Sequence, residues 1–199
     1  MARPKHRTKP GATYFITTDT WQRRALFRNT TMAQIVERRL FGYRDKGFYL
    51  VHRSVVMSDH FHVILTPGEN TALEKAVQLI KGGASHEIGK KFRSRLPIWH
   101  AGFTEHQIRD QTDYDTHVSY IDMNPVEAGL ARQPGDYPFC SARGEHRHDP
   151  WPVASGAKAL EREAGGTAGL KPRPSKSEET KLSPHEGFNP VATRGGRSN

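Results

Sequence analysis

Residues 48–66 read FYLVHRSVVMSDHFHVILT, and this stretch decides the fold expected of the chain. Residues 48–57 and 60–66 are rich in β-branched and aromatic side chains, a composition typical of strands. The dipeptide Ser58-Asp59 between them is typical of a turn. The stretch therefore predicts two consecutive strands joined by a turn.

The second of these strands begins with the triplet His60-Phe61-His62. Because alternate side chains of a strand share a face, both imidazoles should point to one side, and Phe61 should enter a core with Val63 and Leu65 on the other. Two imidazoles on one rigid face can hold a divalent cation and leave positions for another ligand and for substrate oxygens. In a chain with 11 histidines such a pair can also arise by chance. The metal site is favoured because two polar rings on an otherwise apolar strand need a reason.

Upstream of this stretch the sequence predicts one more strand and a helix. Residues 12–18, ATYFITT, form an aromatic and β-branched run that indicates a strand. Asn29 can cap a helix over residues 30–46, which Gly47 should end. The apolar residues of this helix keep helical spacing: Met32, Ile35, Val36, Leu40 and Tyr43.

Downstream, Pro67-Gly68 breaks the chain before a long helix expected over residues 71–92. The pair Gly82-Gly83 weakens the middle of that helix by about 1 kcal/mol per glycine relative to alanine, which allows a kink or break there. A fourth strand is expected over residues 99–109, and a third helix over residues 113–123.

The expected order of elements is β-α-β-β-α-β-α. Its first six elements match the ferredoxin-like split βαβ pattern, so the predicted fold class is α+β with an antiparallel sheet and an extra C-terminal helix. Residues 1–147 should form this domain. Residues 148–199 are rich in Pro, Gly and Ser and hold only two aromatic residues, Trp151 and Phe188, so we expect a disordered basic tail. That tail could tether the protein to nucleic acid or be solvated without a specific role.

Length and composition restrict the class of protein. The chain has 199 residues, a formal net charge of +9, a pI near 9.8 and 35% hydrophobic residues. The single cysteine, Cys140, excludes an intramolecular disulfide and a multi-cysteine zinc site. Neither a membrane span nor a secretory signal is recognisable, so a cytoplasmic, nucleoid-associated protein is expected. The positive charge indicates a polyanionic partner, most simply nucleic acid.

The expected third helix carries Tyr120, with Asn124 one turn later on the same side. One interpretation makes Tyr120 a nucleophile and Asn124 a third metal ligand through its carbonyl oxygen. The other makes Tyr120 a packing residue and Asn124-Pro125 a helix stop, because proline disfavours helical geometry in the residue before it. The residues alone leave both interpretations open.

Five motifs, in this order and spacing, resemble a known family. They are residues 1–4 with 14–18, the segment MSDHFHVIL at 57–65, Trp99 with Gly102-Phe103, the segment YIDMNPVEAGL at 120–130, and Tyr137-Pro138 with Ser141-Ala142. Together they resemble the single-tyrosine HUH (histidine–apolar–histidine) transposases of the insertion-sequence 200/605 type, and within them the bacterial REP-associated tyrosine transposases. The resemblance covers residues 1 to about 143. Three residues depart from the family pattern: Ser58-Asp59 stands in place of Pro-Asn, and Glu127 in place of a basic residue.

The resemblance implies an enzyme that cleaves and rejoins single-stranded DNA through a 5′-phosphotyrosine. It implies Tyr120 as the nucleophile and His60, His62 and Asn124 as ligands of Mg²⁺ or Mn²⁺. It also implies hairpin or palindromic DNA as the partner, and leaves open whether the protein is a monomer or a homodimer.

Basic and aromatic residues are the expected DNA contacts, because cations bind phosphates and aromatic rings stack on unpaired bases. The candidates are Arg3, Lys5, Arg7, Trp21, Arg23, Arg24, Lys81, Lys90, Lys91, Arg93 and Arg95. Two other functions remain open at this point. One is a catalytically silent nucleic-acid-binding module on the same fold, and the other is a small metalloenzyme that uses the two histidines without a covalent intermediate.

Overall fold

A computed structural model describes residues 9, 11–93, 97–145 and 148–151, and the structural statements below concern these residues. The chain divides into residues 1–161 and 162–199, and every described residue belongs to the first unit. No helix in the described part of the chain is long and apolar enough to cross a membrane.

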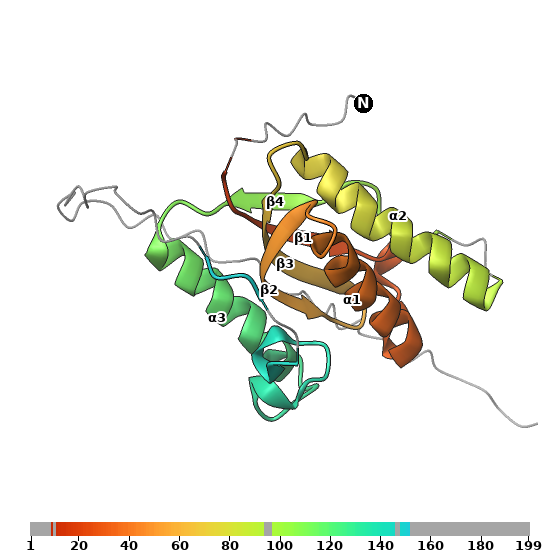
Figure 1. Ribbon diagram of the computed structural model, residues 1–199. Coiled ribbons are helices and arrows are strands. Elements are labelled where there is room, and N and C mark those ends of the chain that lie inside the picture. Colours follow the sequence, from red (N-terminus) through yellow and green to blue (C-terminus); the bar gives the residue numbers. More distant parts are fainter. Residues whose placement is uncertain (1–8, 10, 94–96, 146–147, 152–199) are drawn as a thin grey trace, which may run out of the picture. The chain divides into compact units, whose positions relative to one another are not determined.

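A four-stranded antiparallel sheet forms the centre of this unit (Figure 1). Its strands are β1 (Tyr14–Asp19), β2 (Tyr49–Val56), β3 (His60–Pro67) and β4 (Thr104–Gln107), in the order β2-β3-β1-β4. Each strand is antiparallel to its neighbours, and this order with its two crossovers is the ferredoxin-like arrangement that the sequence predicts.

Three helices cover the two faces of the sheet. Helices α1 (Thr30–Arg44) and α2 (Leu73–Phe92) lie together on one face, and α3 (Gln111–Glu127) lies on the other (Figure 1). Phe61, Val63 and Leu65 of β3 enter the core on the α1 and α2 side. Each such side chain contributes about 1.5–3 kcal/mol when fully buried. The burial of these residues fixes which face of β3 is left for its two histidines.

The first helix begins where the sequence predicts. The Asn29 side chain accepts a hydrogen bond from the backbone N–H of Met32, which satisfies one of the free donors of the first turn. Short 3-10 turns η1 (Trp21–Arg23) and η2 (Leu26–Arg28) precede it, and η3 (Pro134–Asp136) and η4 (Ser141–Arg143) follow α3.

Helix α2 is continuous through Gly82-Gly83, so the kink that this pair allows does not occur. The reason lies in packing against α1. A Cβ atom on Gly83 would come within 2.8 Å of the Tyr43 hydroxyl and 2.9 Å of its ring. Gly83 therefore provides room for Tyr43 of α1 against α2, and the packing keeps the helix straight despite its low intrinsic helix propensity.

Two expected boundaries are wrong. The fourth strand is limited to Thr104–Gln107, and Trp99 joins the sheet only through an isolated bridge to Thr20. Helix α3 runs past Pro125 to Glu127, so Asn124-Pro125 is not a helix stop. Pro125 has no N–H to donate to the carbonyl of Ile121, so the helix loses one hydrogen bond there. The chain nevertheless stays helical to Glu127, and the N–H of Leu130 donates to the Pro125 carbonyl at 2.8 Å. Asn124 consequently stays helical.

The packed structure reaches Trp151, a few residues past the expected boundary at residue 147. Asp149 forms an ion pair with Arg44 and accepts a hydrogen bond from the backbone N–H of Val51 at 2.8 Å. The Trp151 indole donates to Thr13 at 3.0 Å and stacks on Tyr114 with ring centroids 4.6 Å apart. The rest of the expected tail lies outside the described residues.

Candidate active site

The two histidines of β3 lie together on the side of the sheet that α3 covers. Both are buried, and their ring centroids are 4.7 Å apart. The next inward residue on this face, Ile64, packs in the smaller core together with Ile121 of α3. The alternation expected of the strand is thus realised, and it places both imidazoles between the sheet and the helix that carries Tyr120.

One ring nitrogen of His62 makes a hydrogen bond, and the other has no hydrogen-bond partner among the described residues. Its Nδ1 lies 2.8 Å from the Thr17 hydroxyl of β1, opposite it in the strand register. Its Nε2 is buried and makes no hydrogen bond to any described residue. Burial, with the charges of His60 and Arg23, lowers the pKa of His62 well below its ordinary value. The ring is therefore neutral at pH 7 and holds an unused lone pair or N–H, depending on the tautomer.

His60 is held by the turn that precedes it. Its Nδ1 lies 2.7 Å from one carboxylate oxygen of Asp59, and the other oxygen pairs with Arg23 Nε at 3.0 Å. Burial alone would raise the pKa of Asp59, but the hydrogen bond with His60 and the charge of Arg23 lower it below its usual value. Asp59 is thus an ionised acceptor, and the second ring nitrogen of His60 remains for another ligand.

Tyr120 of α3 lies directly against this pair. Its ring centroid is 5.1 Å from that of His62 and 5.8 Å from that of Phe15. Burial raises the pKa of Tyr120, a hydrogen bond with the Asn124 side chain opposes that rise, and the nearby charge of Glu127 adds to it. Asn124 is itself buried. Because α3 is helical from Tyr120 through Asn124, the Asn124 side chain lies one turn from Tyr120 on the same side of the helix.

These donors suit a divalent cation. The observation that carries this fit is the buried Nε2 of His62, which no described residue engages in a hydrogen bond. A buried polar atom without a partner costs about 1–3 kcal/mol, and a bound cation would remove that cost. Two imidazole nitrogens and an amide oxygen together form a mixed N/O ligand set of the kind that binds a divalent cation.

A second cluster, missed at the sequence level, lies at the start of α3. Ligand atoms of His106, Asp113 and His117 lie within 4.8 Å of one another, close enough to hold a metal ion. These three residues already form hydrogen bonds with one another, and Asp113 also with Arg109. Asp113 accepts from His106 Nε2 at 2.9 Å and from Arg109 Nε at 2.9 Å, and His117 Nδ1 donates to the Asp113 carbonyl at 2.7 Å. This cluster therefore ties β4 to α3 without needing an ion.

Asp113→Asn is expected to destabilise the protein by about 2 kcal/mol at pH 7, and by about half of that at pH 3. Burial alone would raise the pKa of Asp113, but hydrogen bonds from Arg109 and His106 lower it to about 2. A carboxyl whose pKa is lowered on folding stabilises the fold above its unfolded pKa and loses that contribution as the pH falls. Urea unfolding at several pH values measures the difference. Asp115→Asn, on the exposed side of the same helix, should show almost none. A pH-independent difference would contradict the ion-pair origin.

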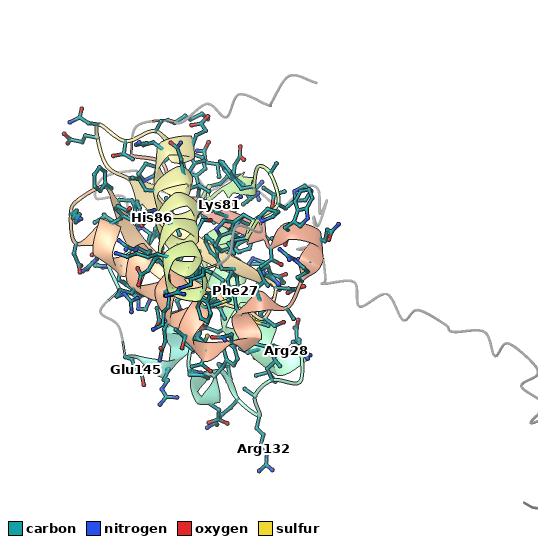
Figure 2. All side chains as sticks on the ribbon, turned by 90° about the vertical axis from the view of Figure 1, so that its right-hand side faces the viewer. Phe27, Arg28, Lys81, His86, Arg132 and Glu145 are labelled. Atoms are coloured by element: carbon teal, nitrogen blue, oxygen red, sulfur yellow. The ribbon has the colours of Figure 1, made fainter. Side chains whose placement is uncertain are left out.

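The basic candidates occupy three different settings. Lys90 and Lys91, in the last turn of α2, and Arg93, its C-cap, are exposed. Lys81 lies further up α2 (Figure 2), where its ammonium donates to the carbonyls of His100 and Gly102. Burial lowers the pKa of Lys81 to about 8. The candidates outside the described residues are Arg3, Lys5, Arg7 and Arg95.

The remaining candidates gather around η1. Trp21 is exposed and its ring stacks on that of His100, with centroids 6.2 Å apart. Arg24 donates to the carbonyls of Trp21 and Pro97. Arg23 pairs with Asp19 and Asp59. Trp21 is therefore presented outward, whereas both arginines are engaged within the protein.

A ferredoxin-like sheet with paired histidines facing a helical tyrosine defines the single-tyrosine HUH class of proteins, and comparisons with known proteins agree with this class. A family model described as "Transposase IS200 like" matches residues 9–124. A REP-associated tyrosine transposase of Escherichia coli (strain K12) is 31% identical over 144 residues, which cover 72% of this chain and 84% of that protein. A relative from Haemophilus influenzae, named for the same type of enzyme, is 27% identical over 108 residues, covering 49% and 61%.

A solved structure of a REP-associated tyrosine transposase bound to a REP hairpin is also similar. It superposes with a TM-score of 0.61 at 28% identity, and the match covers 83% of this chain and all of that one. The chain therefore belongs to the IS200-like transposase family, in its branch of REP-associated tyrosine transposases. It is an enzyme of the transposase class.

Proposed function

We propose that the protein cleaves and rejoins single-stranded DNA through a covalent 5′-phosphotyrosine at Tyr120. The observation that carries this proposal is the placement of the Tyr120 ring, whose centroid lies 5.1 Å from that of His62. The buried Nε2 of His62 has no hydrogen-bond partner within the part of the chain that the structure describes. A nucleophile beside an unused metal-ligand atom is the arrangement that metal-assisted phosphoryl transfer requires.

The covalent step exchanges one phosphate ester for another. The Tyr120 oxygen attacks the scissile phosphorus, the bond from phosphorus to the 3′ oxygen breaks, and the 3′ oxygen takes a proton as the strand end leaves. Attack by a 3′-hydroxyl reverses the step, so rejoining needs no nucleotide cofactor. Because burial raises the pKa of Tyr120, its phenol is protonated in the free protein and must lose its proton during attack.

His60, His62 and Asn124 are the proposed ligands of Mg²⁺ or Mn²⁺. When bound, the cation supplies Lewis-acid polarisation of a non-bridging phosphate oxygen and favours the phenolate. His62 is suited to this role because it is neutral and its Nδ1 is held by Thr17. The amide of Asn124 has a second proposed function, since its hydrogen bond orients the Tyr120 hydroxyl.

Hairpin DNA is the proposed substrate, by analogy with the related transposase solved in complex with a REP hairpin. The exposed cations at the end of α2 suit contacts with phosphates, and the outward Trp21 ring suits stacking on an unpaired base.

The test is a covalent-adduct assay with the full chain. Labelled single-stranded hairpin oligonucleotides with varied flanking sequences are incubated with the protein and Mg²⁺, Mn²⁺ or EDTA, and then separated under denaturing conditions. We expect a labelled protein band that depends on the cation, and a shortened strand with a free 3′-hydroxyl. Hairpin binding without an adduct would favour a silent binding module. Cleavage without an adduct would favour a metal-dependent hydrolase.

A further inference from the structure

The segment between β1 and α1 holds two consecutive residues in a strained backbone conformation. Gln22 and Arg23 both have left-handed φ angles, 56° and 55°. Each such residue other than glycine costs roughly 1–2 kcal/mol. Flanking hydrogen bonds hold the segment in place, because the Thr20 hydroxyl donates to the Arg24 carbonyl at 2.7 Å and Trp21 N–H donates to Ile98 at 2.8 Å. A strained turn that is held this firmly indicates a use for the side chain it directs.

That side chain is Arg23, whose guanidinium lies between two carboxylates. One of its NH groups pairs with Asp19, the last residue of β1, and its Nε donates to Asp59 Oδ2 at 3.0 Å. The backbone joins the same two segments, since Thr20 N–H donates to the Asp59 carbonyl and Phe27 N–H to the Ser58 carbonyl, both at 2.8 Å. The turn before β3 is therefore fixed from outside by the η1 and η2 region.

Asp59, which Arg23 holds in place, also contacts His60. Its Oδ2 is taken by Arg23, and its Oδ1 lies 2.7 Å from His60 Nδ1. An ionised carboxylate can only accept hydrogen bonds, so His60 Nδ1 must carry the ring proton. The Nε2 of His60 is then left as the lone-pair donor, in a ring whose rotation is fixed. Carboxylate partners fix metal-binding histidines in this way and raise their basicity.

We propose that Arg23 and Asp59 are positioning residues for His60, and that Arg23 is not a phosphate contact. This inference rests on the proposed role of His60 as a metal ligand. Two aspartates already neutralise Arg23, and its two carboxylate contacts define its geometry.

The first measurement uses the metal-free protein. In ¹⁵N NMR spectra of the histidine rings, wild-type His60 should show a single tautomer with the proton on Nδ1. Asp59→Ala should give a tautomer mixture for that ring, whereas Asp59→Asn should keep the tautomer, because the amide oxygen still accepts from Nδ1. His62, held by Thr17, serves as the internal control in every spectrum.

The second measurement is Mn²⁺ affinity, from the EPR signal of the free ion. Asp59→Ala should weaken binding by about 10- to 100-fold, the usual effect of losing a partner of a metal ligand. Arg23→Gln should weaken binding in the same direction. Arg28→Gln is the matched control, because Arg28 is exposed near the same segment (Figure 2) and should leave Mn²⁺ affinity unchanged.

The third measurement separates positioning from DNA contact. Hairpin affinity is measured in EDTA at several salt concentrations. Arg23→Gln should leave the affinity and its salt dependence as in Arg28→Gln, whereas loss of a phosphate contact would reduce the salt slope by about 1. A reduced slope with unchanged Mn²⁺ affinity would overturn the proposal, as would an unchanged His60 tautomer in Asp59→Ala. If wild type forms no adduct but the tautomer and Mn²⁺ results hold, the proposed function fails and the positioning role stands.

Discussion

Tyr120→Phe is expected to abolish the covalent protein–DNA adduct and to lower strand cleavage by at least about 10³-fold. The substitution removes only the nucleophilic oxygen. The ring that packs near His62 and Phe15 stays, so the fold should be retained. Hairpin affinity should change by less than about threefold, or ~0.6 kcal/mol, since the hydroxyl is one polar group within a large interface. Denaturing gels measure the adduct, and binding titrations in EDTA measure the affinity.

Tyr114→Phe is the matched control for this experiment. Tyr114 lies on the same helix, and its ring contacts Trp151 and His52, away from the proposed ligands. This variant should form the adduct at the wild-type rate. An adduct that persists in Tyr120→Phe would place the nucleophile on another side chain. Equal loss in both variants would indicate damage to α3 rather than removal of a reacting group.

Features with a local cause could be predicted from the sequence. The alternation of residues 60–66 assigns Phe61 to the core and both histidines to the opposite face, because strand periodicity alone decides this. The Asn29 cap likewise depends on a side chain and a backbone group three residues apart. The ferredoxin-like order follows from such local patterns, since each element buries one apolar face.

Features that depend on tertiary contacts could not be predicted. The continuity of α2 through Gly83 depends on Tyr43, forty residues earlier in the chain. The engagement of Arg23 by Asp59 depends on a turn that only the folded sheet brings near η1. In the sequence Arg23 is one of several basic residues, and its closeness to Trp21 suggests only a contact with DNA. His106 and Arg109 precede Asp113 by only seven and four residues, but they reach it because the chain turns from β4 into α3 between them, and the sequence does not show the path of that turn.

His62→Leu is expected to remove the response of the protein to Mn²⁺. A cation that binds only the folded state stabilises it by RT ln(1 + [L]/Kd), about 1.4 kcal/mol at ten times Kd. Wild type should show this gain in urea unfolding with Mn²⁺ relative to EDTA. His62→Leu has neither the Nε2 of the wild-type ring, which has no hydrogen-bond partner among the described residues, nor any other ligand atom. It should therefore show almost no gain, and cleavage should fall by at least about 100-fold.

His106→Leu decides which cluster holds the ion. His106, Asp113 and His117 form the alternative metal site, but Asp113 already accepts from His106 and Arg109. This variant should be less stable in EDTA, because it loses a hydrogen bond to Asp113, yet it should keep the wild-type gain with Mn²⁺. The opposite pattern, a gain kept in His62→Leu and lost in His106→Leu, would move the metal to the start of α3. Tyr120 would then lose its cation, since its ring lies against His62 and its helix turn carries Asn124.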